Sequence, residues 1–378
     1  MAKILIVTSR FLPNSAGGAE KLAFDYADIL SQNHDITIAT TTAKDYISWK
    51  NELNSGESFY KNIKIIRFKV LRERNIKKMN SVLDSCLNNL NNIKPHLEEK
   101  FIIEQGPYCP DLIDYIESNQ KEFNLIFLVG YLYYPIVFSI PLLKIPFIVV
   151  PTFHDEPVLN LPIFKRTYLP NYFYCFNAPE ELDIYRNKFS NRITNYSMIG
   201  TYIPLPDISH VHSQIHSNNN RIDIDESFKI LTIGRIEPAK GYPRLLSEFT
   251  EWKEISKSNE IKLICLGSAS NVDIKKYQHI LFPGFVSEED KSNFLIQSNL
   301  LINPSPFESF SIAIMEAWSY EKPVLVNAIS EVMVGHINRC QGGLYYSDNI
   351  SFFLMLNHLI QNDSLRERLG KNGRLYVE

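Results

Sequence analysis

The sequence predicts an α/β protein of two domains, each built on a parallel β-sheet. The chain has 378 residues, which suits two or three domains of roughly 100–200 residues each. Short, almost continuously apolar segments alternate with amphipathic helical segments in both halves of the chain, as in parallel sheets covered by helices. A polar stretch near residues 204–225, rich in His and Asn, separates the two series.

The first domain is predicted from residues 1–205 and opens with a βαβ unit. Residues 3–8 read as a buried strand, residues 18–32 repeat apolar side chains at helical spacing, and residues 34–40 form a second strand. The alternation then continues through a strand at 63–68, a helix at 110–119, strands at 124–129 and 146–150 around a helix at 133–143, and a helix that opens at 177–180.

The second domain is predicted from residues 227–378, after a linker at 206–226. It restarts with a strand at 228–233 and a glycine loop, and we expect its final residues to pack back on the first domain. The predicted elements that follow are helices at 242–254, 288–297 and 309–319 and strands at 261–266, 279–282, 300–303 and 323–327.

The composition excludes several classes of protein. Hydrophobic residues make up 45% and charged residues 21%, which indicates a globular chain. The net charge is −3, without the basic excess of a nucleic-acid-binding protein. Five scattered cysteines without a CxxC pair match neither a disulfide framework nor a zinc site, so we expect a reducing, cytoplasmic location.

One segment is a candidate membrane span. Residues 125–143 contain no charged side chain and are long enough to cross a bilayer. Pro135 and Pro141 interrupt them, and proline inside a helix costs about 3 kcal/mol or more. The apolar run at residues 4–7 is too short for a signal peptide. We therefore predict strand, helix and strand in a buried core.

Each domain has a glycine loop after its first strand. Gly17 and Gly18 precede the first helix, where backbone N–H groups can meet an anion, but the spacing is not that of a dinucleotide fingerprint. A tight turn explains the pair equally well. In the second domain Gly234-Arg235-Ile236-Glu237-Pro238-Ala239-Lys240-Gly241 brackets two cations that suit a phosphate. The alternative is a solvated basic loop.

The segment around Glu308 and Glu316 carries the third motif. Eight residues on one helix correspond to about 12 Å of rise, too far for a close carboxylate pair. The prolines before it predict a helix start near Ser309, so Glu308 would lie in the loop beside the free N–H groups of Ser309, Phe310 and Ser311. This arrangement suits an anion at the helix end and hydroxyls on Glu308. A capped helix with a surface glutamate is the alternative.

Taken in order, Gly17-Gly18, the GRIEPAKG segment at 234–241 and the Glu-x7-Glu segment at 308–316 resemble the retaining glycosyltransferases of family 4. The resemblance covers nearly the whole chain. It implies the GT-B fold, in which two Rossmann-like domains with parallel sheets face each other across a cleft. It also implies a nucleotide-diphosphate sugar, UDP- or GDP-linked, as donor, a glycan or lipid-linked acceptor in polysaccharide assembly, and no metal cofactor.

The resemblance assigns roles to particular residues. Arg235 and Lys240 would bind the diphosphate, Glu308 the sugar hydroxyls and Glu316 the ribose. His154, which follows the strand at 146–150, would face the transferred sugar, although a lone histidine is more often structural. The implied catalytic residues are His154, Glu308, Arg235 and Lys240. The implied donor-binding residues are Gly17, Gly18, Gly234, Arg235, Lys240, Phe285, Val286, Glu308, Ser309, Phe310, Ser311 and Glu316, with Phe285 and Val286 at the base.

Two other functions fit the same architecture. A sugar-nucleotide 2-epimerase-like isomerase lacks the combination of GRxxxxKG with the 308–316 segment. A catalytically weak nucleotide-sugar-binding subunit is opposed by the intact Glu308, Arg235 and Lys240. Family members usually continue beyond the equivalent of residue 378 through a helix that crosses back to the first domain, so we expect a short member or a truncated chain.

A basic stretch between residues 64 and 78 interleaves cations with apolar side chains. It could rest on an anionic membrane, which would place the protein peripherally at the inner face, at about 1 kcal/mol per basic residue. A solvated charged face is the equal alternative. The cations are Lys64, Arg67, Lys69, Arg72, Arg74, Lys77 and Lys78.

Overall fold

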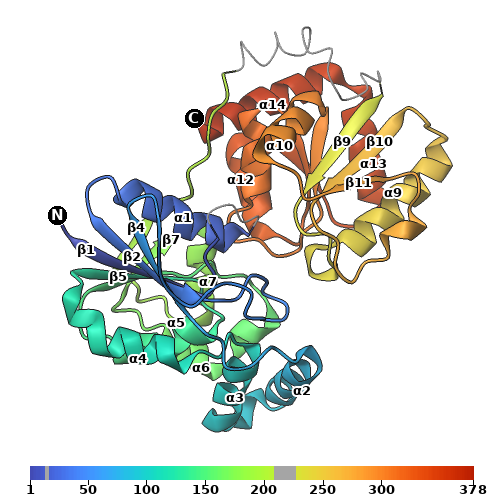
Figure 1. Cartoon of the computed structure of the whole chain (residues 1–378). Coiled ribbons are helices and arrows are strands. Elements are labelled where there is room, and N and C mark those ends of the chain that lie inside the picture. Colours follow the sequence, from blue (N-terminus) through green and yellow to red (C-terminus); the bar gives the residue numbers. More distant parts are fainter. Residues whose placement is uncertain (13–16, 208–226) are drawn as a thin grey trace. The chain divides into compact units, whose positions relative to one another are not determined.

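The structure, a computed structural model, describes residues 1–12, 17–207 and 227–378. They form two compact units, Met1–Tyr202 and Ile203–Glu378, and each is a Rossmann-like sheet covered by helices (Figure 1). The predicted α/β fold class is thereby confirmed. Most of the predicted linker, residues 208–226, and residues 13–16 of the first glycine loop lie outside the described residues.

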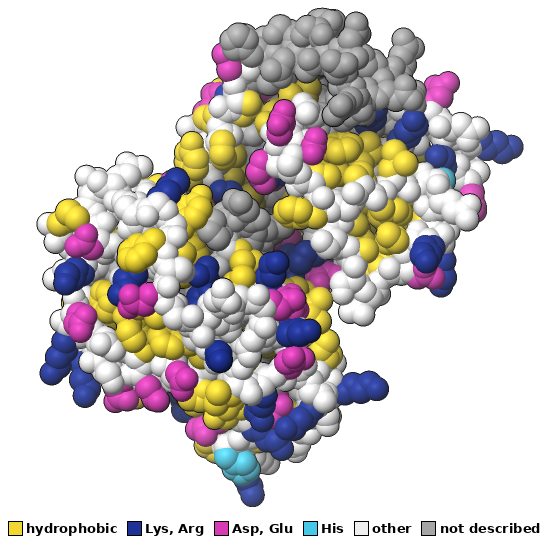
Figure 2. Space-filling model, in the orientation of Figure 1, with side chains coloured by type: hydrophobic (Ala, Val, Ile, Leu, Met, Phe, Trp, Pro, Cys, Tyr) yellow, Lys and Arg dark blue, Asp and Glu magenta, His cyan; other side chains and the backbone are white. Residues whose placement is uncertain are grey.

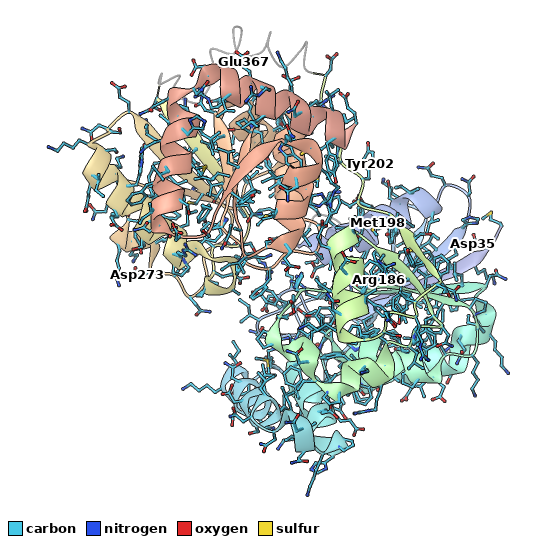
Figure 3. All side chains as sticks on the ribbon, turned by 180° about the vertical axis from the view of Figure 1, so that it is seen from behind. Asp35, Arg186, Met198, Tyr202, Asp273 and Glu367 are labelled. Atoms are coloured by element: carbon cyan, nitrogen blue, oxygen red, sulfur yellow. The ribbon has the colours of Figure 1, made fainter. Side chains whose placement is uncertain are left out.

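The sheet of the first unit has the strand order β3-β4-β2-β1-β5-β6-β7-β8 and is parallel except for the edge strand β3. Its strands are β1 (Lys3–Thr8), β2 (Asp35–Thr41), β3 (Gly56–Tyr60), β4 (Ile63–Phe68), β5 (Leu125–Val129), β6 (Phe147–Val150), β7 (Phe173–Phe176) and β8 (Tyr196–Met198). Figure 3 labels Met198 at the end of β8 and Tyr202, where this unit ends.

Helices cover both faces of this sheet. Because successive side chains of a strand point to opposite faces, Ile4 and Ile6 of β1 pack with the first helix, while Leu5 and Val7 pack into the larger cluster on the other face. The helices are α1 (Gly18–Leu30), α2 (Ile76–Leu87), α3 (Pro95–Gln105), α4 (Pro110–Asn119), α5 (Tyr134–Ser139), α6 (Pro162–Thr167) and α7 (Pro179–Lys188).

The sheet of the second unit is parallel, with the order β11-β10-β9-β12-β13-β14. Its strands are β9 (Phe228–Ile233), β10 (Ile261–Leu266), β11 (Leu281–Gly284), β12 (Leu300–Asn303), β13 (Val324–Asn327) and β14 (Gly343–Tyr346). Its helices are α9 (Tyr242–Ser256), α10 (Glu288–Gln297), α11 (Ile312–Ser319), α12 (Glu331–Cys340), α13 (Asn349–Gln361) and α14 (Asp363–Val377).

The last helix, α14, packs closely on α11 of its own unit. A Cβ at Gly373 or Gly342 would lie less than 3.0 Å from the ring of Trp318, so both glycines are needed where α14 and the loop before β14 close over this indole. Trp318 is fully buried and donates from Nε1 to the Gly342 carbonyl at 2.8 Å. Helix α14 is therefore part of the second unit and contributes Leu365 and Leu369 to its core.

The apolar segment 125–143 folds as β5, α5 and a short 3-10 helix (Ile140–Leu142), followed by β6. The predicted succession of strand, helix and strand is therefore confirmed for this segment. In the part of the chain that the structure describes, no helix has the length and apolar character needed to cross a bilayer. Two predicted boundaries are wrong: the strand predicted at 279–282 lies at Leu281–Gly284, and the helix predicted from 309 begins at Ile312.

Candidate functional site

In the second unit, the sheet has a switch point between β9 and β12. The chain proceeds from β9 to β10 and β11 on one side, then returns to place β12 on the other side of β9. Open parallel sheets bind ligands outside the carboxyl ends of the strands at such a point. The loops that leave β9 and β12 there are the two segments with the predicted phosphate-binding and glutamate motifs.

Glycines allow these loops to approach each other backbone to backbone. Gly241 has φ +76°, and a Cβ there would lie less than 3.0 Å from the carbonyl of Pro304 in the loop after β12. Gly267, after β10, has φ +137°, and its Cβ would meet the Gly234 carbonyl equally closely. No other residue type fits these positions without moving a loop.

An ion pair joins the two loops across the switch point. The Lys240 ammonium lies 2.9 Å from Glu308 Oε1, and both side chains are largely shielded from water. The nearby Arg235 guanidinium lies 3.4 Å from Glu237 Oε1 and is more exposed. The structure thus brings Lys240 and Glu308 together as a charged centre, with Arg235 on the same loop as Lys240.

The helix predicted to start at Ser309 begins three residues later, and that prediction is wrong. Ser311 adopts φ +66°, and its hydroxyl accepts a 2.8 Å hydrogen bond from Asn303 Nδ2 at the end of β12. This bond holds Ser311 in a left-handed turn, which delays the helix to Ile312. Glu308 lies in the loop as predicted, but the N–H groups of Ser309 and Phe310 belong to that loop and not to the helix.

Glu316, on α11, is held by a lysine that sequence reasoning missed. Lys291 Nζ on α10 lies 2.7 Å from Glu316 Oε1 and 2.8 Å from Glu288 Oε2. Burial acts to lower the pKa of Lys291, but Glu316 and Glu288 outweigh it, and the pKa is raised above its usual value. Lys291 is therefore a fixed cation that orients the Glu316 carboxylate.

Phe285 and Val286, the residues predicted to bind the base, directly follow β11. The Phe285 side chain is 62% exposed, whereas Val286 packs against the core cluster that also receives Phe310. The exposed ring offers a flat apolar surface to a ligand. The two residues thus differ: Val286 is partly buried against the core, and Phe285 is available for contact.

In the first unit, the corresponding switch point lies between β1 and β5. Gly17 is the N-cap of α1, and a Cβ there would lie less than 3.0 Å from the Glu20 carboxylate, whereas Gly18 faces open space. The Glu20 carboxylate forms an ion pair with Arg10, which follows β1. Sequence reasoning found both glycines but missed this pair.

His154 lies in the loop after β6 as predicted, beside two groups that were not predicted. Its Nδ1 lies 3.8 Å from Glu156 Oε1, and the hydroxyl of the buried Tyr131 donates to the same carboxylate oxygen. The His154 and Glu156 side chains are 30% and 27% exposed, so a polar ligand can reach both. The sequence feature that could have indicated the Glu156 partner is the acidic pair Asp155-Glu156 directly after the histidine.

Beneath this loop lies Glu181, a fully buried carboxylate on α7. Its Oε1 accepts a 2.8 Å hydrogen bond from the Phe153 N–H, and its Oε2 accepts one of 2.7 Å from the Asn177 N–H. Burial raises the pKa of Glu181 to about 8, while N–H donors of Asn177, Phe153 and Thr152 act to lower it. It was not predicted, because the local sequence does not distinguish Glu181 from its neighbour Glu180.

Charge pairing reduces the net charge of the basic stretch at 64–78. Arg74 packs 4.9 Å from the Trp49 ring centroid and donates to the Gln105 carbonyl. Figure 2 shows Lys and Arg interspersed with Asp and Glu over the visible face of the first unit. Three cations of the stretch form ion pairs: Lys64 with Glu57 at 2.6 Å, and Arg72 and Lys78 with Glu104 at 3.1 and 2.8 Å.

The two parallel-sheet units, with charged loops at the carboxyl ends of their strands, define an α/β protein of the GT-B type. Solved structures with this fold superpose on the chain over its full length. Sucrose-phosphate synthase from Thermosynechococcus elongatus is 14% identical and superposes with a TM-score of 0.70, covering 100% of this chain and 94% of that one. HepE from Anabaena, in complex with UDP and glucose, is 13% identical with a TM-score of 0.67, covering 100% and 95%.

Sequence comparison finds a family match within the second unit. Residues 215–376 match the family described as "Glycosyl transferases group 1". The capsular polysaccharide biosynthesis glycosyltransferase CapM of Staphylococcus aureus is 26% identical over 175 residues. That match covers 43% of this chain and 46% of CapM, so it spans less than half of either protein. The solved structures show the GT-B fold, and the family match covers less than half of the chain.

Proposed function

We propose that this protein is a retaining glycosyltransferase. It would move a hexose from a nucleotide-diphosphate sugar to a glycan or lipid-linked acceptor during polysaccharide assembly. The observation that carries the proposal is the Lys240–Glu308 ion pair, 2.9 Å long, at the switch point of the unit that matches the glycosyl transferases group 1 family. The similarity to CapM, a capsular polysaccharide enzyme, supports this substrate class.

The second unit would hold the nucleotide. Arg235 can grip a phosphate with two parallel hydrogen bonds, and Lys240 adds a point charge beside it. Glu308 would bind hydroxyls of the transferred sugar, and Glu316 the ribose, in the orientation that Lys291 fixes at 2.7 Å. Phe285 would lie against the base, and HepE complexes with UDP and UDP-glucose support a uridine nucleotide.

Retention would follow from attack by the acceptor oxygen on the face of the sugar where the bond to the diphosphate breaks, and stabilisation of the leaving group would assist that cleavage. The diphosphate departs from the face that the acceptor attacks, and its developing negative charge lies beside Arg235, Lys240 and the N-terminus of α11. The first unit would contribute His154 to the sugar and the Gly17-Gly18 backbone to the diphosphate and acceptor. We expect the reaction to proceed without a metal ion at the diphosphate.

Contact with a membrane through the basic stretch is a separate proposal. Lys69 and Lys77 are exposed, and beside them the apolar side chains of Leu71 and Ile76 are 59% and 42% exposed. Cations next to exposed apolar side chains suit an anionic lipid surface that carries a lipid-linked acceptor. Flotation with vesicles of increasing anionic lipid content tests this, and binding that does not respond to the lipid charge would refute it.

Turnover of a panel of UDP- and GDP-sugars tests the main proposal. We expect release of one nucleotide and, by NMR, a product with the anomeric configuration of the donor. Lys240→Ala and Glu308→Ala should each reduce kcat/KM by about 100-fold, which corresponds to about 2.7 kcal/mol of transition-state stabilisation. Lys276→Ala is the matched control, because it removes an exposed ion pair with Asp273 at 3.7 Å.

The same panel separates the alternatives. An isomerase would return an epimerised nucleotide sugar without net transfer, and a binding subunit would bind donor in calorimetry without turnover. Wild-type activity in Lys240→Ala and Glu308→Ala would show that the assigned site is wrong even if the protein transfers sugar.

A further inference from the structure

Glu181 connects two neighbouring strand-end loops of the first unit. It is the third residue of α7, near the N-terminus of the helix, whose last turn carries the exposed Arg186 labelled in Figure 3. One carboxylate oxygen accepts from the Phe153 N–H after β6, and the other accepts from the Asn177 N–H and Nδ2 after β7, at 2.7 and 3.0 Å. β6 and β7 are adjacent in the sheet, so one side chain fixes both loops.

The loop after β6 is strained where Glu181 holds it. Thr152 adopts φ +56°, a left-handed conformation that is unfavourable for a β-branched residue. The next residue, Phe153, turns its ring into the core and is fully buried among Tyr131, Tyr168 and Phe189. This inward turn leaves the following residue, His154, with its imidazole partly exposed.

A packing role alone does not explain a carboxylate at this position. Burial of a carboxyl group, neutral or charged, is costly unless hydrogen bonds compensate, and an apolar side chain would fill the same space at lower cost. Both Glu181 oxygens are used by backbone N–H groups of loops at the ligand-binding edge. Tyr26 on α1 and Cys175 on β7 face the carboxylate, and neither is a cation.

We propose that Glu181 is a positioning residue that presents His154, and with it Glu156, to the sugar. The inference rests on the proposed glycosyl transfer and adds to it a residue that touches no substrate. Glu181 acts through the Phe153 N–H: the hydrogen bond fixes the strained Thr152 turn, and the turn fixes the direction of the imidazole. A glutamine cannot replace it, because its NH2 nitrogen cannot accept a hydrogen bond, whereas both oxygens of a carboxyl group can, protonated or ionised.

Steady-state kinetics of Glu181→Gln tests the proposal. We expect kcat to fall at least tenfold while KM for the donor stays within twofold, because the nucleotide would be bound by the second unit. Glu180→Gln is the matched control, with the same substitution at the neighbouring, partly exposed position. Asn177→Ala is the milder second variant, since it removes only the 3.0 Å side-chain donor, and it should lower kcat by about threefold.

Chemical modification reads the position of His154 without any activity. Diethyl pyrocarbonate modifies accessible imidazoles, and mass spectrometry gives the rate at each histidine. We expect Glu181→Gln to change the rate at His154 at least threefold and to leave the rate at His279, in the second unit, unchanged.

The outcomes separate the two proposals. A wild-type protein that turns over no donor refutes the proposed function, while an altered His154 rate in Glu181→Gln still supports the positioning role. An active wild type whose kcat and His154 rate are both unaffected by Glu181→Gln and Asn177→Ala overturns the positioning role and leaves the proposed function standing.

Discussion

We predict that the first unit loses stability as the pH rises from about 5 to about 8, and that Glu181→Gln removes most of this loss. Burial raises the pKa of Glu181 from 4.5 to about 8, so between these values the folded unit keeps a proton that the unfolded chain releases. The free energy of unfolding therefore falls with pH in this window and levels off above it. The substitution deletes the titrating group and should flatten the curve.

The magnitude follows from the same two pKa values. At about 1.36 kcal/mol per pH unit, a rise from 4.5 to about 8 corresponds to about 5 kcal/mol. This is a large fraction of the roughly 5–15 kcal/mol that stabilises a typical domain. Even half of this change in the free energy of unfolding would be measurable. Asp45 does not interfere: burial acts to raise its pKa, but hydrogen bonds from Ser48 and Ile47 lower it, so it titrates below this window.

Pulsed hydrogen–deuterium exchange in urea, read by mass spectrometry, measures each unit separately. Peptides from residues 1–202 report the unfolding midpoint of the first unit, and peptides from residues 227–378 report that of the second. Wild type, Glu181→Gln and Glu180→Gln are compared at the same pH, from 5 to 9, so that intrinsic exchange rates cancel. Only Glu181→Gln should change how steeply the unfolding midpoint of the first unit depends on pH.

A difference between wild type and Glu181→Gln that is equal at every pH would refute the reasoning. Such a result would mean that Glu181 stabilises or destabilises the fold without changing its protonation. The carboxyl would then be ionised throughout, with the four N–H donors outweighing its burial.

Three further predictions concern the second unit. His336 is buried beside Arg339, and burial first and this cation second lower its pKa to about 3, so the unit should gain stability as pH rises to about 6.5; His336→Gln should abolish the gain in the same exchange experiment. Gly267→Ala should lower the free energy of unfolding by about 3 kcal/mol in urea, since its Cβ would collide with the Gly234 carbonyl. Lys291→Met should weaken UDP binding about tenfold in calorimetry by releasing the Glu316 carboxylate.

Local sequence patterns predicted the main strands and helices, because apolar runs indicate buried strands and a proline in the first turn indicates the start of a helix. The apolar runs at β1, β9 and β10 and the helices α4 and α10 lie where the sequence predicts them. The four-residue strand β7 was missed, because a run as short as Phe173–Phe176 has no period that separates strand from helix. Two helices were also missed: α3 lacks a strong apolar stripe, whereas α2 has one in Ile76, Met79, Leu83 and Leu87, which the prediction overlooked.

The candidate site was predicted in part, and the missing part is non-local. Motif residues adjacent in sequence to strand ends, such as Lys240 and Glu308, were found, and the structure brings these two together, while their roles stay predictions. The partners that orient them were not: Lys291 reaches Glu316 from another helix, and Asn303 delays the start of α11 through one hydrogen bond to Ser311. Such contacts depend on which strand ends meet, which the topology decides and a local pattern does not.

The two units use a carboxylate at a strand end in opposite ways, and burial separates them. Glu308 keeps 16% of its side chain exposed and faces an ammonium that a phosphate can also attract, so its partner can be exchanged when a ligand arrives. Glu181 is fully buried and faces backbone N–H groups that no ligand can displace. Exchangeable contacts suit binding and fixed contacts suit positioning. For this reason, substitution of Glu308 should affect donor binding and turnover together, whereas substitution of Glu181 should affect turnover alone.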